Sequence, residues 1–294
     1  MVSDIREFMA KKKGRYRALA REHLAFAKTQ LEIDREGNLY YAALEIRKVL
    51  EALIYQIAGN YTNDLPKSDL GIWQPAKLLN ILLKIDPMAD RSGEIRFARE
   101  SDDPDHVPQW NSLGEDRRVT LTEIKRNYDA LGAYLHTPTA VQLMKNKGRD
   151  AKRLRVRLDK LAVRLEEILS AKVHNFIMKN TSSFDCAECG ARITRNVAAL
   201  KGGIREDECD ELIVECFDCD ASYRLTAGAG DEIIMDEDLV DIKCPVENCG
   251  NMIHVWKRRA TLGLRVQCPE CDSVLQIAMG ILVEENQRTN KSCE

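Results

Sequence analysis

Apolar residues recur at helical spacing through most of the first half of the chain. From Ser3 to Ala58 successive apolar positions are three or four residues apart, which predicts two helices. Gly37 is a plausible stop for the first helix, and Asn38 is a plausible N-cap for the second. The predicted apolar face of the second helix comprises Leu39, Ala42, Ala43, Ile46, Leu50, Leu53 and Ile57. A continuous face of this kind is typical of a helix packed on a core.

The same spacing predicts three later helices. Pro75 is expected to open a short one. Thr120 and Glu123 form a capping-box signature for another, which ends at His136. A long helix from about residue 139 to residue 176 carries a coiled-coil-like seam. The seam consists of Leu154, Leu158, Leu161, Leu165 and Ile168.

The remaining N-terminal segment, residues 91–118, lacks helical periodicity and is interpreted as an irregular loop. We therefore expect an all-α helical bundle over residues 1–140 and a basic connecting helix over residues 141–180. The chain has 294 residues, which is enough for about two domains.

Short runs with strand character follow residue 180, and eight of the ten cysteines fall among them as close pairs. Thiolates two to four residues apart on a tight turn bind one metal ion, and two such pairs complete the tetrahedral sulfur shell that Zn²⁺ prefers. The eight candidate ligands are Cys186, Cys189, Cys216, Cys219, Cys244, Cys249, Cys268 and Cys271.

An internal repeat indicates which pairs join. Residues 212–225 align without a gap to residues 264–277, so each repeat reads knuckle, strand, loop, strand, knuckle, strand. A self-similar unit is expected to carry a complete site. This predicts two zinc ribbons, over residues 181–229 and 238–283, each with one structural zinc ion, followed by a flexible tail over 284–294. A cross-braced pairing, or cysteines without metal, are the alternatives. The fold class is therefore multidomain α+β.

Charge is distributed unevenly although the net charge is only −3. The first 183 residues carry about seven more basic than acidic side chains, whereas the remainder carries about ten more acidic ones. Nucleic-acid binding is dominated by phosphate neutralisation, so acidic ribbons are poor general binders of phosphate. Exposed carboxylates suit a basic protein partner better.

Two basic clusters are candidate nucleic-acid contacts. One lies on the predicted connecting helix and includes Arg153, Arg157, Lys160 and Arg164. The other follows an aromatic residue in the second ribbon and consists of Lys257, Arg258 and Arg259. The alternative for both clusters is a solvated surface.

The N-terminal half resembles a HEPN domain over residues 15–140. The similarity rests on Leu39–Glu51 and on Tyr128–His136, which is similar to a later helix of that superfamily that ends in histidine. The resemblance implies a bundle of four or five helices, homodimerisation and, in active members, metal-independent RNA cleavage. The active motif is an arginine, four to six residues and a histidine.

His136 occupies the place of the family histidine, but the three permitted arginine positions hold other residues. Arg126 is the nearest basic residue upstream, and Arg47 or a partner subunit are other sources of positive charge. Imidazole suits proton transfer, and arginine neutralises phosphoryl charge. The other interpretations are a helix C-cap for His136 and an intrahelical ion pair between Arg47 and Glu51.

Two hypotheses follow. The chain is either a zinc-binding, RNA-associated HEPN-like protein in RNA metabolism or defence, with His136 and Arg126 as candidate catalytic residues, or a non-catalytic dimeric scaffold or sensor whose ribbons bind a protein. No apolar run reaches the length of a membrane span, and the N-terminus lacks a signal-peptide pattern, so we expect a cytoplasmic protein. Cys209 and Cys293 have no companion at ligand spacing.

Overall fold

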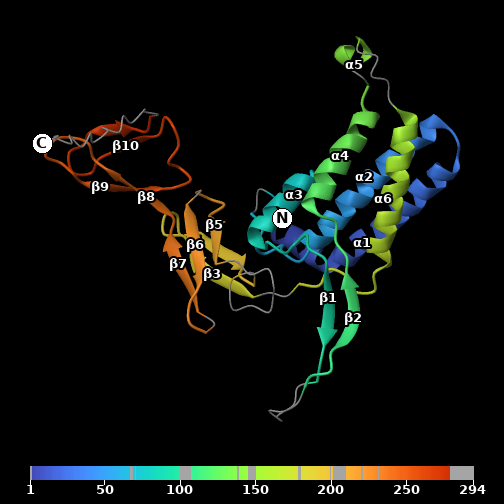
Figure 1. Ribbon diagram of the computed structural model, residues 1–294, viewed down its shortest axis with the longest axis horizontal. Coiled ribbons are helices and arrows are strands. Elements are labelled where there is room, and N and C mark those ends of the chain that lie inside the picture. Colours follow the sequence, from blue (N-terminus) through green and yellow to red (C-terminus); the bar gives the residue numbers. More distant parts are fainter. Residues whose placement is uncertain are drawn as a thin grey trace, which may run out of the picture. The chain divides into compact units, whose positions relative to one another are not determined.

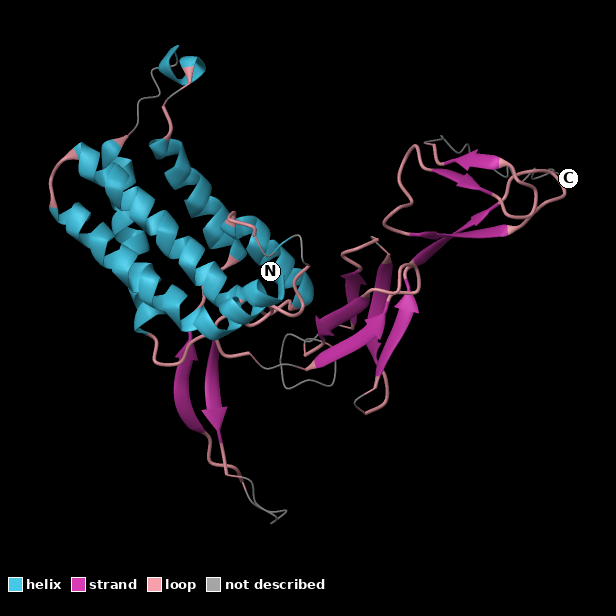
Figure 2. Cartoon of the chain, turned by 180° about the vertical axis from the view of Figure 1, so that it is seen from behind, coloured by secondary structure: helices cyan, strands magenta, loops and turns pink. Residues whose placement is uncertain are grey.

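The computed structural model describes residues 2–278 except 67–68, 70, 100–106, 138, 145–149, 178–179, 199, 201–209, 220 and 231. Cys209, Cys293 and the predicted tail therefore lie outside the described residues. The chain forms two compact units. The first, the helical unit, comprises residues 1–184 and 192–209, and the second, the ribbon unit, comprises residues 185–191 and 210–294. Helices followed by small antiparallel sheets confirm the α+β class (Figure 2).

Helix α2 (Glu36–Ala58) lies at the centre of the helical unit and contacts α1 (Val2–Glu32), α3 (Pro75–Ile85), α4 (Leu121–Leu135) and α6 (Ala151–Ser170) (Figure 1). A helix surrounded on several sides needs more than one apolar stripe. Twelve residues of α2 are buried, and they include every residue of its predicted apolar face. The sequence therefore predicted the core of this unit correctly.

The predicted ends of the first two helices are wrong. Helix α1 ends at Glu32, and α2 is preceded by Arg35 in an extended conformation, so Gly37 lies inside the first turn of α2. Asn38 does not cap α2, because its Nδ2 donates a hydrogen bond to Gln30 Oε1 of α1 at 2.6 Å. The side chain that resembled a cap instead joins the two helices.

The capping box of α4 is confirmed, with Thr120 accepting from the Glu123 N–H at 3.1 Å and Glu123 accepting from the Thr120 N–H at 2.8 Å. The long helix predicted from residue 139 to residue 176 is shorter than expected. A short helix, α5 (Ala140–Met144), precedes it, and α6 begins after Asp150, whose side chain accepts from the Arg153 N–H. All five seam residues of α6 are buried, and α6 is a member of the bundle because it contacts α1 and α2.

The segment interpreted as an irregular loop contains an antiparallel hairpin of β1 (Gly93–Phe97) and β2 (Asn111–Asp116). Its register shifts after Ile95, and Gly114 has a φ of 122°, a value that favours glycine. Regular alternation is interrupted at this bulge, which explains why periodicity did not predict the strands.

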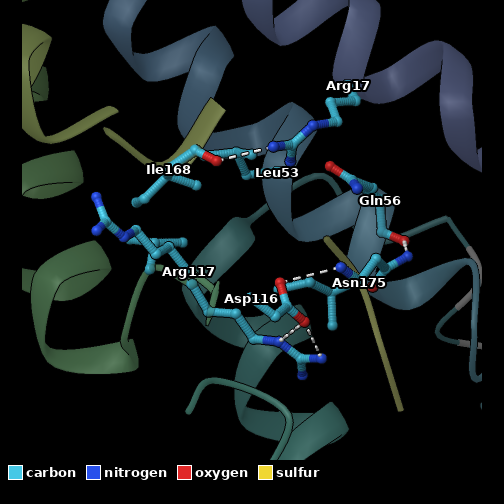
Figure 3. Close-up of a pocket in the computed structure, with 10 residues that line it drawn as sticks. Arg17, Leu53, Gln56, Asp116, Arg117, Ile168 and Asn175 are labelled. Atoms are coloured by element: carbon cyan, nitrogen blue, oxygen red, sulfur yellow. Dashed lines mark hydrogen bonds and ion pairs between the residues drawn. The ribbon is translucent and has the colours of Figure 1, made fainter. Parts of the chain in front are cut away.

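A polar network connects the hairpin, α1, α2 and the segment after α6 (Figure 3). Arg17 donates to the carbonyl of Ile168 at 2.8 Å and to other carbonyls at the end of α6, so it caps that helix. Asp116 accepts from the backbone N–H of Asn175 at 3.0 Å and from the Arg118 guanidinium at 2.8 Å. The cavity among these side chains measures about 20 Å³, room for about one water molecule and far too little for a substrate.

Five small antiparallel sheets contain all the strands that the structure describes. In the helical unit β1 pairs with β2, and β3 (Thr181–Asp185), whose last residue belongs to the ribbon unit, pairs with β4 (Arg192–Asn196). The ribbon unit contains three sheets, whose strands are β5 (Glu211–Glu215), β6 (Ser222–Ala227) and β7 (Ile233–Glu237); β8 (Leu239–Lys243) and β9 (Met252–Trp256); and β10 (Arg265–Gln267) and β11 (Val274–Gln276).

A single residue, Asp238, separates β7 from β8, so residues 233–243 run almost without interruption from the sheet of the first ribbon into that of the second (Figure 1). We call residues 233–243 the shared strand. The ribbon bounds predicted from the sequence, 181–229 and 238–283, leave residues 230–237 outside both ribbons. These residues instead supply the third strand of the first ribbon sheet.

Candidate metal centres

The first centre is formed by two knuckles of the ribbon unit. The Sγ atoms of Cys186 and Cys219 lie 3.5 Å apart, and those of Cys189 and Cys216 lie 3.6 Å apart. Zn–S bonds of about 2.3 Å in a tetrahedron place the sulfur atoms about 3.8 Å apart. A disulfide would require about 2.05 Å between sulfurs. The four sulfurs, which all lie within 4.8 Å of one another, are therefore spaced for a shared metal ion.

The second centre repeats this geometry. The Sγ atoms of Cys244 and Cys271 lie 3.8 Å apart, and those of Cys249 and Cys268 lie 3.7 Å apart. Each group therefore joins the first and second cysteine pairs of one repeat, as the internal repeat predicted, and the cross-braced alternative is wrong. Both centres are closed by four sulfurs, so neither offers the open position that a catalytic zinc ion requires.

Backbone hydrogen bonds shape all four knuckles alike. The N–H of the first cysteine in each pair donates to a carbonyl just beyond the second, as between Cys186 and Ala191 at 2.9 Å and between Cys244 and Asn251 at 2.8 Å. Gly190, which directly follows Cys189, has a φ of 73°. Such a tight left-handed turn aims two nearby thiols at one point, which explains why the close spacing in the sequence was informative.

The thiols of each centre differ in acidity. Burial raises the pKa of Cys186, but hydrogen bonds from the Tyr223 hydroxyl and from backbone N–H groups outweigh burial and lower that pKa to about 6. Burial and the adjacent sulfurs raise the pKa of Cys219 to about 12. The second centre shows the same contrast between Cys268, at about 6, and Cys249, at about 12. Four thiolates coexist at such a site when a cation neutralises their repulsion, and this donor set fits Zn²⁺.

Tyr223 supports the first centre from β6. Its hydroxyl donates to Cys186 Sγ at 3.1 Å and accepts from the Ala187 N–H at 2.9 Å, and the side chain is fully buried. In the second centre the amide of Asn251 lies 3.9 Å from Cys268 Sγ. Groups of this kind fix the orientation of metal ligands. Sequence reasoning missed both residues, although both lie within a few positions of a knuckle.

The second ribbon contacts the knuckles of the first. Trp256 Nε1 donates to Glu188 Oε2 at 3.1 Å, and Arg259 Nη1 donates to Glu188 Oε1 at 3.0 Å. Arg259 also donates to the carbonyl of Cys219, and the ring of Trp256 packs on that of Tyr223 with centroids 5.2 Å apart. One glutamate and one arginine therefore join the two ribbons directly beside the first metal centre. We call these contacts the ribbon clamp.

The other basic residues of this loop also pair with carboxylates of the first ribbon and the shared strand. Arg258 Nη1 lies 2.8 Å from Glu215, and Lys257 Nζ lies 3.8 Å from Asp238, which also pairs with Arg224 at 3.2 Å. The loop was predicted to be either solvated or a nucleic-acid contact. The structure places its three basic residues in ion pairs within the ribbon unit, and their binding to nucleic acid stays an untested prediction.

The candidate catalytic residues lie on α4 and just after it. Arg126 and His136 are both exposed, and His136 directly follows the helix in an extended conformation. Ten residues of α-helix correspond to a rise of about 15 Å. One copy of α4 therefore does not bring the arginine and the histidine to a single phosphate.

Arg47 and Glu51 both contact Tyr128 of α4. The guanidinium of Arg47 lies 4.0 Å from the centroid of the Tyr128 ring, and the Tyr128 hydroxyl donates to Glu51 at 2.6 Å. Burial, and then Glu51, raise the pKa of Tyr128. The two α2 side chains hold α4 in place through a cation–π contact and a hydrogen bond.

The basic residues predicted to contact nucleic acid from α6 divide into two groups. Arg157 donates to Asn127 Oδ1 at 3.1 Å, and Arg164 donates to Glu123 at 3.1 Å, so both bind to α4. Arg153 and Lys160 are exposed. The basic stripe of the sequence is therefore partly used for contacts inside the bundle.

Comparisons with family models, with curated proteins and with solved structures found no match for this chain. The helical N-terminal part agrees with the fold implied by the HEPN resemblance. Membership of that family has no further support. Within the described residues, none of the helices combines the length and the apolar character needed to cross a bilayer.

Proposed function

We propose that this protein is a zinc-binding, non-catalytic interaction protein whose ribbon unit binds a basic polypeptide partner. The observation that carries the proposal is the pair of closed four-sulfur centres. Such centres organise a fold and do not activate water. The 20 Å³ cavity of the helical unit gives no room for a substrate either.

The charges of the ribbon unit support a basic partner. Four of its basic residues pair with carboxylates of the same unit, namely Arg224, Lys257, Arg258 and Arg259. Other carboxylates, including Asp236, Glu237 and Glu247, are exposed. A surface on which four cations are paired internally and several anions face solvent attracts cationic partners and repels phosphate.

We further propose that the helical unit forms a homodimer through α1 and α2. His23 Nδ1 lies 2.6 Å from Glu45, and Gln30 bonds to Asn38, which fixes the antiparallel register of the two helices. Phe26 of α1 and Tyr41 of α2 are both exposed, at 53% and 64%. Exposed aromatic residues on adjacent helices suit a dimer interface.

The test compares two probes on the full zinc-loaded chain at physiological salt. One is a fluorescent lysine-rich peptide, and the other is a fluorescent single-stranded RNA of 20 nucleotides. We expect measurable peptide binding that weakens with added salt, and much weaker RNA binding. Tighter binding of the RNA would overturn the proposal in favour of an RNA-associated protein.

A further inference from the structure

The shared strand exposes an edge that the fold leaves open. Among the described residues β7 has β6 as its strand neighbour and β8 has β9, so each has one free side. The hydrogen bonds show whether these free sides coincide. At Asp238 the N–H donates to the Ser222 carbonyl at 2.9 Å and the carbonyl accepts from the Lys257 N–H at 2.9 Å. In an antiparallel strand the N–H and the C=O of one residue point to the same side. Strands β6 and β9 therefore lie end to end along the same side of the shared strand.

The hydrogen bonds at the two ends of this ladder also involve even-numbered residues. The Glu232 carbonyl accepts from the Gly228 N–H, and the Cys244 N–H donates to the Asn251 carbonyl, both at 2.8 Å. Backbone groups alternate between the two edges of an antiparallel strand. The odd-numbered residues therefore direct their N–H and C=O groups toward the open side, and they are Ile233, Met235, Glu237, Leu239, Asp241 and Lys243.

This open edge is long and accessible. It runs through five residues of β7, Asp238 and five residues of β8. Met235 is 40% exposed, and Glu237, Asp241 and Lys243 are also exposed. A row of free backbone donors and acceptors is a template for another strand.

The side chains along the edge indicate what kind of strand it accepts. Glu232, Asp236, Glu237 and Asp241 are exposed carboxylates, against the single cation of Lys243. A second copy of this strand would bring an equally acidic edge, which like-charge repulsion disfavours. A segment with lysine or arginine at alternate positions matches both the charge and the hydrogen-bond pattern.

We infer that the shared strand binds an extended, basic peptide segment by β-strand addition, which adds one strand across both ribbons. This inference rests on the proposed function and names its surface and its mode of binding. Main-chain hydrogen bonds hold the segment, and the carboxylates select its charge. Because the strand crosses both ribbons, the bound segment also fixes their alignment.

The first test uses two labelled peptides of eleven residues on the full zinc-loaded chain. In one peptide lysine alternates with threonine, and in the other lysine alternates with proline. The charges are equal, but proline cannot donate to a ladder. We expect the threonine peptide to bind at least about tenfold more tightly. Equal binding of the two peptides overturns strand addition but still agrees with an acidic surface that binds a basic partner. If neither peptide binds, the proposed function is overturned as well.

Two proline variants locate the edge. Met235→Pro removes an outward N–H of the shared strand while sparing its bonds to β6. Ile213→Pro is the matched control, because Ile213 is similarly exposed, at 46%, and its N–H points outward from the opposite edge of the same sheet. We expect Met235→Pro to weaken the threonine peptide about tenfold and Ile213→Pro to leave binding within about twofold. If Ile213→Pro weakens peptide binding and Met235→Pro does not, the peptide binds at the β5 edge and the inference is overturned.

Amide hydrogen exchange of the unmodified chain gives an answer that does not depend on variants. Even-numbered amides of the shared strand are expected to be protected before the peptide is added. Addition of the threonine peptide should slow exchange at the odd-numbered amides of Met235, Glu237, Leu239 and Asp241. Slowing without this alternation, or no slowing under saturating peptide, contradicts strand addition.

Discussion

The helical unit and the ribbon unit are stabilised by different means. Helix α2 alone buries twelve residues, most of them apolar, in the core of the helical unit. The buried cluster of the second ribbon has four members, and two of them are the candidate ligands Cys244 and Cys268. Small folds with so little apolar core require another source of stability. From this comparison we propose that metal binding at the two four-sulfur centres replaces a large apolar core in the ribbon unit.

Metal removal should produce the largest difference between the units. With a chelator we expect the ribbon unit to lose its fold while the helical unit keeps its helices, and with Cys216→Ser we expect only the first ribbon to lose its fold. Structural zinc contributes on the order of 10 kcal/mol or more to such folds. Unit-specific amide exchange and circular dichroism check this. Cys209→Ser is the control and should leave both units folded, and an intact ribbon unit in excess chelator would contradict the account.

A core substitution should have the opposite selectivity. Leu50→Ala removes a side chain that is 1% exposed at the centre of the bundle. We expect a loss of about 2–5 kcal/mol in the free energy of unfolding of the helical unit, with zinc content unchanged. The matched control, Val163→Ala on exposed α6 surface, should cost under about 0.5 kcal/mol. Denaturant unfolding followed by helix content measures both variants.

The ribbon clamp is expected to have an intermediate effect. Arg259→Ala removes the hydrogen bonds to Glu188 and to the Cys219 carbonyl. We expect the ribbon unit to lose about 1 kcal/mol of stability, since these are partly exposed charged bonds. Arg265→Ala, at an exposed position of β10, serves as the comparison. If Arg259→Ala and Arg265→Ala lower the Tm of the ribbon unit equally, the ribbon clamp does not stabilise the contact between the ribbons.

Lowering the pH should destabilise the helical unit through protonation of Glu45. Burial raises the pKa of Glu45, but hydrogen bonds from Lys48 and His23 outweigh burial and lower it. A lowered folded-state pKa contributes stability above the unfolded pKa of about 4.3, and this stability is lost as the pH falls through the folded value. We expect Glu45→Gln to be less stable than the parent at pH 6, by under about 1 kcal/mol. The difference should vanish near pH 3 in denaturant titrations, and a constant difference would contradict this.

The smallest expected effect concerns His136. If the helical unit has no ribonuclease site, His136→Ala leaves total RNA as intact as the parent protein does, in the presence of chelator. Gel analysis of the RNA checks this. If the parent protein cleaves RNA and His136→Ala abolishes the cleavage, the helical unit is catalytic, and the ribbons have a supporting role.

The sequence predicted those features that depend on nearby residues. Cysteine spacing and the internal repeat identified both metal centres, and helical spacing identified the cores of α2 and α6. It did not predict the ribbon clamp, because Glu188 and Arg259 are 71 residues apart and pair only in the folded unit. The shared strand was missed for a related reason, since the pairing of residues 233–237 depends on where β6 lies.

Mass measurement of the intact chain under native conditions tests the central claim most directly, because it counts metal ions and subunits together. The account predicts two zinc ions per chain, and one per chain in Cys216→Ser. Four zinc ions in a mass corresponding to two chains would agree with both the account and the proposed dimer. An unmodified chain whose two ribbons fold with one zinc ion or none contradicts the account.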